Sequence, residues 1–261
     1  MGNIETDIMT IQNVSLRYNA GKKEAGVSAL ENVNLSIQKG DFVALLGPSG
    51  CGKSTLLNIM AGLLEPTEGE IYMLGERVKG VDWRRAVVFQ TPTLYPWMNT
   101  YDNVAFGPNV RGIDKYEVEQ RTKKYLALVG LTEFADNKPY ELSGGMRQRA
   151  ALARVLVNDP NMILMDEPFG ALDALTRTNM QALVRDIWQK TDNTVFLITH
   201  DVDEALTLGT RVLVMSSRPG RIVNEFETKF TYAIEDGDED VRYSPEYVEL
   251  RKVILNQIQS Q

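Results

Sequence analysis

Short runs of apolar residues recur along the chain, and segments with helical spacing separate them. Residues 33–37 alternate apolar and polar side chains, which is typical of a strand with one buried face. Residues 42–46, 162–166 and 194–199 are apolar or β-branched almost throughout, which is typical of short strands buried on both faces. Residues 174–191 carry helical spacing between two of these runs. Since alternating strands and helices form parallel sheets, the pattern predicts an α/β fold with a mainly parallel sheet.

Two other segments modify this picture. Residues 69–78 resemble a hairpin element, so we expect antiparallel strands in the N-terminal part of the chain. Residues 91–138 contain no convincing strand, and apolar positions such as Val118 and Tyr125 recur there at helical spacing. The sequence therefore predicts a helical subdomain inserted into the sheet domain.

These patterns divide the chain into three parts. We expect an α/β core formed by residues 1–90 and 151–226, a helical subdomain at 91–150, and a C-terminal tail with a helix at 227–261. One face of the tail helix carries Tyr247, Leu250, Ile254 and Ile258. An acidic cluster precedes that helix and is expected to be a solvated loop without a metal: Glu235, Asp236, Asp238, Glu239 and Asp240.

The composition narrows the possible functions. The 261 residues are 43% hydrophobic and 24% charged, as in an ordinary soluble globular protein. A net charge of −7 repels phosphate backbones, which disfavours nucleic acid as a partner. The single cysteine excludes an internal disulfide. No apolar run approaches the ~20 residues that a membrane-spanning helix needs.

A glycine-rich loop follows the apolar run 42–46 and precedes a helical stretch. It reads GPSGCGKS from Gly47 to Ser54 and fits the pattern G-x-x-x-x-G-K-[ST]. Glycines let successive backbone N–H groups cradle phosphate oxygens, and the following helix points its positive end at the same anion. Lys53 can reach the β- and γ-phosphates, and the Ser54 hydroxyl can bind Mg²⁺. We therefore predict a nucleotide site at Gly47, Pro48, Ser49, Gly50, Cys51, Gly52, Lys53, Ser54 and Thr55.

Asp166 is the last residue of the apolar run 162–166, and a second carboxylate, Glu167, follows it directly. Such a pair is usually surface charge, but at the end of a buried strand it needs partners. We expect Asp166 to hold Mg²⁺ through water. Glu167 is then placed to polarise the water that attacks the γ-phosphate, because that water must be oriented and lose a proton.

A second candidate anion site lies at Ser143, Gly144 and Gly145, where a serine and two glycines precede a stretch of helix formers. The simpler interpretation is an ordinary helix N-cap. However, the same physics that serves the first loop would let this helix start bind phosphate. Since only one complete nucleotide pocket is present per chain, a symmetric pair of chains could use the second device to complete the partner's pocket.

The chain resembles an ATP-binding cassette ATPase, the motor subunit of an ABC transporter. The resemblance covers nearly the whole chain and rests on GPSGCGKST, LSGGM, MILMDEPFGALD and THD, which occur in the family's order. The commoner form of the second motif is LSGGQ, so Met146 departs from it. Because this position lies beyond the serine and glycines, we expect little effect.

The resemblance implies roles for four further residues. Gln90 matches a glutamine that helps to form the metal site and links this site to the helical subdomain. Asp173 matches an aspartate near the dimer seam, and Tyr18 matches the aromatic residue that stacks on adenine. His200 is the only histidine in the chain and matches the residue that contacts the γ-phosphate. Taken alone, Gln90 and Tyr18 would more often be structural. The alternative for His200 is that its side chain only packs at the end of a strand and has no catalytic role.

The subgroup is indicated by what surrounds these motifs. The chain has neither a long coiled-coil insertion nor a second cassette, and it resembles the compact importer subunits for taurine, aliphatic sulfonates and nitrate. The resemblance implies ATP and Mg²⁺ as cofactors, a second ATPase subunit, integral permease subunits, a solute-binding protein, and a peripheral location at the cytoplasmic face of the cell membrane. Residues 91–101, TPTLYPWMNTY, are expected to contact the permease because aromatic exposed segments favour interfaces.

Two other classes of function stay open at the level of sequence. One is a cassette ATPase of a non-import mechanical complex, such as a cell-division or lipoprotein-release system. The other is a nucleotide sensor without hydrolysis, against which Glu167 and His200 argue. Within import, nitrate or another solute is the alternative to taurine.

Overall fold

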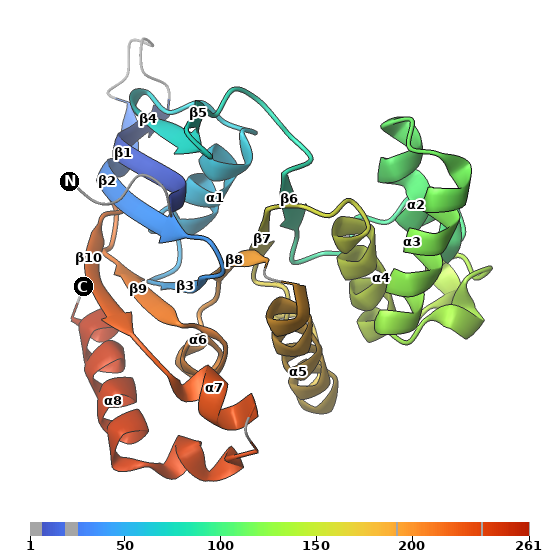
Figure 1. Cartoon of the computed structure of the whole chain (residues 1–261). Helices are drawn as coiled ribbons and strands as arrows, with labels where there is room; N and C mark the ends of the chain where they lie inside the picture. Colours follow the sequence, from blue (N-terminus) through green and yellow to red (C-terminus); the bar gives the residue numbers. More distant parts are fainter. Residues whose placement is uncertain (1–6, 19–25, 192, 236, 261) are drawn as a thin grey trace. The chain divides into compact units, whose positions relative to one another are not determined.

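The computed structural model describes residues 7–18, 26–191, 193–235 and 237–260. The chain forms two compact units (Figure 1). Unit one consists of residues 1–82 and 188–261, and unit two consists of residues 83–187. In the described part of the chain, every helix is too short or too polar to cross a membrane. The predicted division into core, helical subdomain and tail uses other bounds and stays a prediction.

An antiparallel sheet forms the N-terminal part of unit one. Its four strands, in spatial order, are β2 (Val27–Gln38), β1 (Asp7–Tyr18), β4 (Glu68–Met73) and β5 (Glu76–Arg77). The alternation at residues 33–37 is reproduced, because Val33, Leu35 and Ile37 are buried while the residues between them are more exposed. The expected hairpin at residues 69–78 is β4 paired antiparallel with β5. The length of β1 was not anticipated from the sequence pattern.

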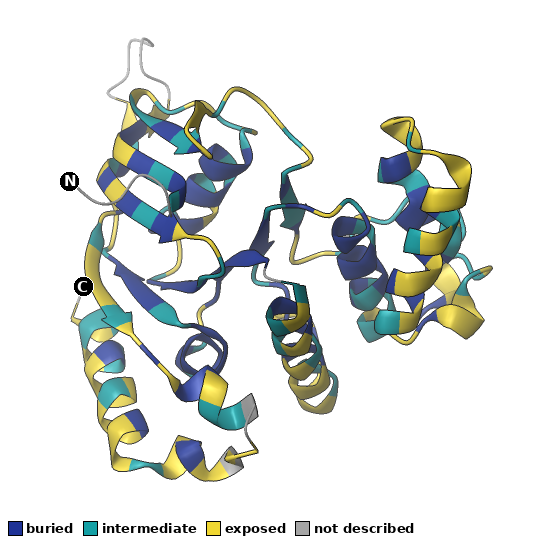
Figure 2. Ribbon diagram, viewed as in Figure 1, coloured by how far each residue is buried: buried dark blue, intermediate teal, exposed yellow. Residues whose placement is uncertain are grey.

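A second set of strands in unit one is mainly parallel. β3 (Phe42–Leu46) pairs in parallel with β8 (Thr194–Ile198) and with β9 (Arg211–Met215), and β10 (Ile222–Glu227) pairs antiparallel with β9. All five residues of β3 are fully buried, and the strand is dark along its length in Figure 2. The prediction that this run is a strand buried on both faces is confirmed.

Among the described residues, the α-helices that belong entirely to unit one are α1 (Lys53–Ala61), α6 (Val202–Leu208), α7 (Phe230–Glu235) and α8 (Pro245–Gln259). α8 buries one face and exposes the other (Figure 2), and its buried residues Tyr247 and Ile254 lie in a core cluster with apolar residues of α6, β3 and β9. The predicted tail helix is therefore confirmed.

The acidic cluster is not one solvated loop. Glu235 ends α7, and Glu239 begins a 3-10 helix, Glu239–Tyr243. Asp236 lies outside the described residues. The sequence pattern missed these elements because they have six and five residues, which is too short for a helical period to be recognised.

Unit two contains β6 (Arg85–Val88) paired in parallel with β7 (Met162–Asp166). Three of its helices pack against one another: α2 (Thr100–Val110), α3 (Lys115–Leu128) and α4 (Gly144–Leu156). α5 (Ala174–Thr191) begins in this unit and ends in unit one. Residues 91–138, all of which the structure describes, contain helices and turns and no strand, as predicted.

We predict that Ile254→Ala weakens unit one. Ile254 is fully buried in the core cluster, so its truncation leaves a cavity and is expected to lower the free energy of unfolding by about 2–5 kcal/mol. The neighbouring Val253 is 39% exposed, and Val253→Ala is expected to cost about 0.5 kcal/mol or less. Urea unfolding of both variants measures the difference. Equal losses would mean that α8 is not packed on the sheet as described.

Candidate functional site

Residues of the predicted nucleotide site fall in both units. Unit one holds the phosphate loop, Tyr18 and His200. Unit two holds Gln90, the two carboxylates, Asp173, and the serine-glycine stretch at the start of α4.

The phosphate loop connects the buried strand β3 to α1, which is the local context that the motif requires. Gly50 and Gly52 have φ angles of 74° and 114°, a backbone conformation that side chains with a Cβ rarely adopt. The Lys53 side chain folds back over the loop, where its Nζ donates to the carbonyl oxygens of Gly47 at 2.8 Å and Pro48 at 2.9 Å. An ammonium held at the loop in this way lies where a bound phosphate would need it.

Close packing fixes the shape of this loop. A Cβ on Gly52 would lie 2.8 Å from the Ala29 carbonyl oxygen and 2.8 Å from Leu30 Cδ2, both on β2. A Cβ on Gly47 would lie 2.9 Å from the Met215 carbonyl oxygen at the end of β9. The loop is thus wedged between two strands, so its N–H groups are oriented before any ligand arrives.

The N-terminus of α1 differs from the other α-helix starts of known cap in the described residues. Its N-cap is Gly52, which makes no cap hydrogen bond through a side chain. By contrast, Asn99, Asp114, Ser143, Asp201 and Ser244 cap their helices with side-chain oxygens. The first N–H groups of a helix need acceptors. At α1 the cap residue has no side-chain acceptor of its own, and an anion at this helix start would provide one, as phosphate binding requires.

Two further predicted residues lie near the loop in unit one. Tyr18 ends β1, is 43% exposed, and its hydroxyl is 3.2 Å from Thr55 Oγ1 on α1. His200 is exposed and follows β8 by two residues. Since β8 is parallel to β3 with Ile198 opposite Leu45, His200 emerges from the same sheet edge as the phosphate loop. The structure therefore places all three features at one edge of unit one.

The turn that carries His200 is held by hydrogen bonds on both sides. Thr199 Oγ1 donates to Glu204 Oε2 at 2.6 Å and accepts from the Asp201 N–H at 3.0 Å. Asp201 Oδ1 in turn accepts from the N–H groups of Asp203 and Glu204, at 2.8 and 3.3 Å. Sequence reasoning missed Thr199 and Glu204, because a threonine at a strand end and a glutamate in a helix carry no distinctive pattern.

The carboxylates in unit two lie at a comparable sheet edge. β6 and β7 are parallel with Val88 opposite Met165, so Gln90 and Glu167 both follow the same end of the pair. A Cβ on Gly170 would lie 3.3 Å from Gln90 Nε2 and 3.8 Å from Glu167 Oε2, which shows that both side chains border this glycine. Glu167 has a φ of 44°, an unfavourable conformation of the kind that collects at functional sites.

The serine-glycine stretch begins α4, as predicted. Ser143 Oγ accepts from the Met146 N–H at 3.3 Å, so the ordinary N-cap geometry is present. A hydroxyl that accepts in this way keeps its O–H to donate, and Ser143 is exposed. A Cβ on Gly145 would lie 2.5 Å from Thr176 Cγ2, so α4 can begin here only without a side chain.

Asp173 also contacts Thr176, at the start of α5. It accepts from the Thr176 N–H at 3.0 Å and from the Thr176 hydroxyl at 2.7 Å, and these hydrogen bonds lower the pKa of Asp173. Thr176 therefore bonds to Asp173 and lies against Gly145, both of which are predicted site residues. No sequence pattern had indicated Thr176.

The aromatic segment 91–101 is organised by a buried amide. Asn103 is fully buried, accepts from the Tyr95 N–H at 2.7 Å, and donates to the Tyr95 and Asn99 carbonyl oxygens at 3.1 and 2.9 Å. This closes the loop and leaves Trp97 67% exposed at its tip. An exposed tryptophan on a fixed loop is the kind of feature that protein interfaces use.

The donor set fits Mg²⁺ bound together with phosphates. Among the described residues, no group of three or more His, Cys, Asp or Glu could hold a metal by itself. Mg²⁺ at phosphates, however, is held by few protein oxygens in addition to phosphate oxygens and water. Unit one has the Ser54 hydroxyl, and unit two has the Asp166 carboxylate and the Gln90 amide oxygen, which are oxygen ligands of the kind that Mg²⁺ prefers.

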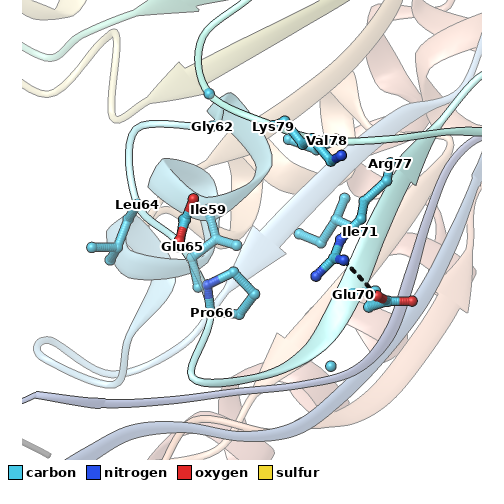
Figure 3. Close-up of a pocket in the computed structure, with 12 residues that line it drawn as sticks. Ile59, Gly62, Leu64, Glu65, Pro66, Glu70, Ile71, Arg77, Val78 and Lys79 are labelled. Carbon is cyan, nitrogen blue, oxygen red and sulfur yellow. Dashed lines mark ion pairs between the residues drawn. The ribbon is translucent and has the colours of Figure 1, made fainter.

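A hollow of about 350 Å³ in unit one lies at the opposite end of α1 (Figure 3). It is lined by Gly62, which ends the helix, and by residues of β4 and β5, where Arg77 Nη1 pairs with Glu70 Oε1 at 3.0 Å. Since α1 separates this hollow from the phosphate loop, the hollow is not part of the nucleotide site.

Comparison with known proteins gives consistent results. A family model described as ABC transporter matches residues 30–170. The chain is 49% identical to the taurine import ATP-binding protein TauB of Roseobacter denitrificans, over 96% of this chain and 93% of that protein. It is 50% identical to an uncharacterized ABC transporter ATP-binding protein of Methanocaldococcus jannaschii, over 88% of this chain and 84% of that protein. A dimeric ATP-binding cassette solved with ADP and Pi is 34% identical, with a TM-score of 0.72 over 85% of this chain and 99% of that chain.

We predict that Gly52→Ala destabilises the protein more than Gly50→Ala. Both glycines have positive φ, so either alanine pays about 1–2 kcal/mol for the backbone. Only at Gly52 does the new Cβ meet backbone and side-chain atoms at 2.8 Å, whereas at Gly50 nothing lies within 4 Å. The clash is expected to add about 1–3 kcal/mol, which urea unfolding would resolve. Identical stabilities would contradict the wedged loop.

Proposed function

This chain belongs to the ABC transporter family, and we propose that it is the ATP-hydrolysing subunit of an importer for taurine or a related sulfonate. The observation that carries the ATPase part is the phosphate loop between β3 and α1, where Gly50 and Gly52 have positive φ and Lys53 Nζ is held against the loop by the Gly47 carbonyl oxygen. The likeness to TauB over nearly the whole chain supports the choice of solute.

Binding is divided among residues with different chemistry. Lys53 and the first N–H groups of α1 neutralise the β- and γ-phosphates, and Tyr18 stacks on the adenine. Ser54, Asp166 and Gln90 hold Mg²⁺, which supplies positive charge against the phosphate oxygens when it is bound. The chain carries a net charge of −7, so attraction of the triphosphate depends on these local groups.

Hydrolysis follows from two further residues. Glu167 orients a water in line with the γ-phosphorus and accepts its proton as the new P–O bond forms. The bond between the γ-phosphorus and the bridging oxygen breaks, and its electron pair stays on ADP. His200 donates a hydrogen bond to a γ-phosphate oxygen, and this bond strengthens as negative charge grows there.

A second copy of the chain completes each site. The exposed Ser143 can donate its O–H to the partner's γ-phosphate, together with the N–H groups of Gly144 and Gly145 at the start of α4. Asp173 lies beside this helix start through Thr176, which suits a place at the dimer seam. The permease subunits dock on the loop that carries Trp97, at the cytoplasmic face of the membrane, and receive solute from a solute-binding protein.

We predict that Glu167→Gln retains ATP binding but loses turnover. Without the carboxylate the attacking water is neither oriented nor deprotonated, and such losses commonly lower kcat by about 10²–10⁴-fold. Glu133→Gln, an exposed glutamate in the same unit, serves as the control for a changed charge and is expected to keep normal kcat. Near-normal steady-state hydrolysis by Glu167→Gln would remove Glu167 from this role.

The proposed solute is tested in the assembled transporter. The chain would be purified with its permease subunits, reconstituted in liposomes with the solute-binding protein, and assayed for phosphate release. We expect taurine to stimulate hydrolysis more than aliphatic sulfonates or nitrate do. Stimulation by nitrate alone would replace the proposed solute. Co-purification with a cell-division or lipoprotein-release complex, without stimulation by any of these anions, would overturn the import function.

A further inference from the structure

The C-terminal helix α8 reaches back to the segment that carries His200. Asp203, in the first turn of α6, accepts a hydrogen bond from the Tyr247 hydroxyl at 2.9 Å. Arg251 donates to the same carboxylate through Nε, at 2.9 Å to Oδ1 and 3.1 Å to Oδ2, and through Nη2 at 3.0 Å to Oδ2. Four hydrogen bonds from two side chains of α8 thus converge on one carboxylate three residues after His200.

We propose that Tyr247 and Arg251 are positioning residues for ATP hydrolysis. Their hydrogen bonds to Asp203 fix the first turn of α6, and this turn in turn fixes the orientation of the His200 imidazole. This inference rests on the proposed function of His200 at the γ-phosphate. It assigns to the C-terminal segment a part in the catalytic geometry, in addition to its packing.

The link between α6 and His200 is short and continuous. The hydroxyl of the buried Thr199 bonds to the side chain of the buried Glu204, and Asp201 caps the same helix turn. His200 lies between Thr199 and Asp201, so neither neighbour can move without the helix. A rotation of α6 therefore rotates the backbone that carries the imidazole.

The link between α6 and α8 has a definite direction. A carboxylate bound by two guanidinium nitrogens is held in plane as well as in distance. Burial alone would raise the pKa of Asp203, but hydrogen bonds from Arg251 and Tyr247 lower it below its ordinary value, so the carboxylate is charged at neutral pH. Tyr247 is itself fixed, because its ring is 2% exposed and packs edge-on against Phe230 with the ring centroids 5.0 Å apart.

Stability alone is a weak explanation of this contact. The side chains of Arg251 and Asp203 are 44% and 47% exposed, and ion pairs that are so exposed contribute about 0–1 kcal/mol. Attachment of α8 to the sheet is already provided by apolar residues such as Ile254. What the hydrogen bonds to Asp203 add is a fixed rotation of α6, which apolar contacts do not specify.

The test uses the full chain with Tyr247→Phe and Arg251→Ala, and Lys252→Ala as the matched control. Lys252 is exposed and is the next cation on the same helix. We expect Arg251→Ala to lower kcat about tenfold with little change in KM for ATP, since a misplaced catalytic group loses rate more than binding. Tyr247→Phe, which keeps the ring, is expected to show a smaller loss in kcat. Lys252→Ala is expected to keep normal kcat.

A spectroscopic measurement separates positioning from folding. Since His200 is the only native histidine, a tag-free protein gives a single imidazole signal in NMR after histidine labelling. Arg251→Ala is expected to shift or broaden that signal, and Lys252→Ala is expected to leave it in place. If the imidazole signal does not move in Tyr247→Phe or in Arg251→Ala, and if both variants keep the normal kcat per folded molecule, the inference is overturned.

Double variants distinguish failure of this inference from failure of the proposed function. If Arg251 acts through His200, then Arg251→Ala adds little to the loss of kcat already caused by His200→Ala. A slow His200→Ala with fully active α8 variants would leave the proposed function intact and overturn only the positioning role. If His200→Ala hydrolyses ATP normally, the proposed role of His200 fails and the inference fails with it.

Discussion

The shape of the phosphate loop is the constraint on which the rest of the proposed site depends. A triphosphate can be bound by an acidic chain only where backbone N–H groups and a cation are fixed in place beforehand. Here the loop lies between a fully buried strand and a helix, and Gly52 and Gly47 lie so close to β2 and β9 that a Cβ at either position would clash. Because β8 runs parallel to β3, the same burial that fixes the loop also fixes where His200 emerges.

The strands β3, β7 and β8 could be predicted because they are short and almost entirely apolar. Their length distinguishes them from helices, and the helices are recognised by their spacing. β10 was missed because most of its residues are exposed and polar residues interrupt its apolar ones, so its pairing with β9 leaves no apolar run in the sequence. The short helix α7 was missed for a similar reason, since the acidic residues that follow it favoured a loop.

The candidate site divides in the same way. Phosphate loops and strand-end carboxylates could be found from the sequence because their chemistry demands particular residues at fixed spacing. Thr176, Asn103 and the pair of Thr199 and Glu204 could not, because each acts through a contact formed only on folding. The clash that makes Gly145 necessary, for example, is with Thr176, thirty-one residues further along the chain, and no local pattern relates the two.

Helix starts show how one structural device serves two purposes. α4 and α6 close their first turns with Ser143 and Asp201, and the caps fix the segments that carry predicted site residues. α1 follows Gly52, a cap residue without a side chain, so its start has no cap hydrogen bond from that residue's side chain. A glycine cap also places no side chain in the way of an anion that approaches the helix start. We therefore expect α1 to serve binding, α6 to serve positioning, and α4 to serve both, because a serine cap accepts one hydrogen bond and still has one to donate.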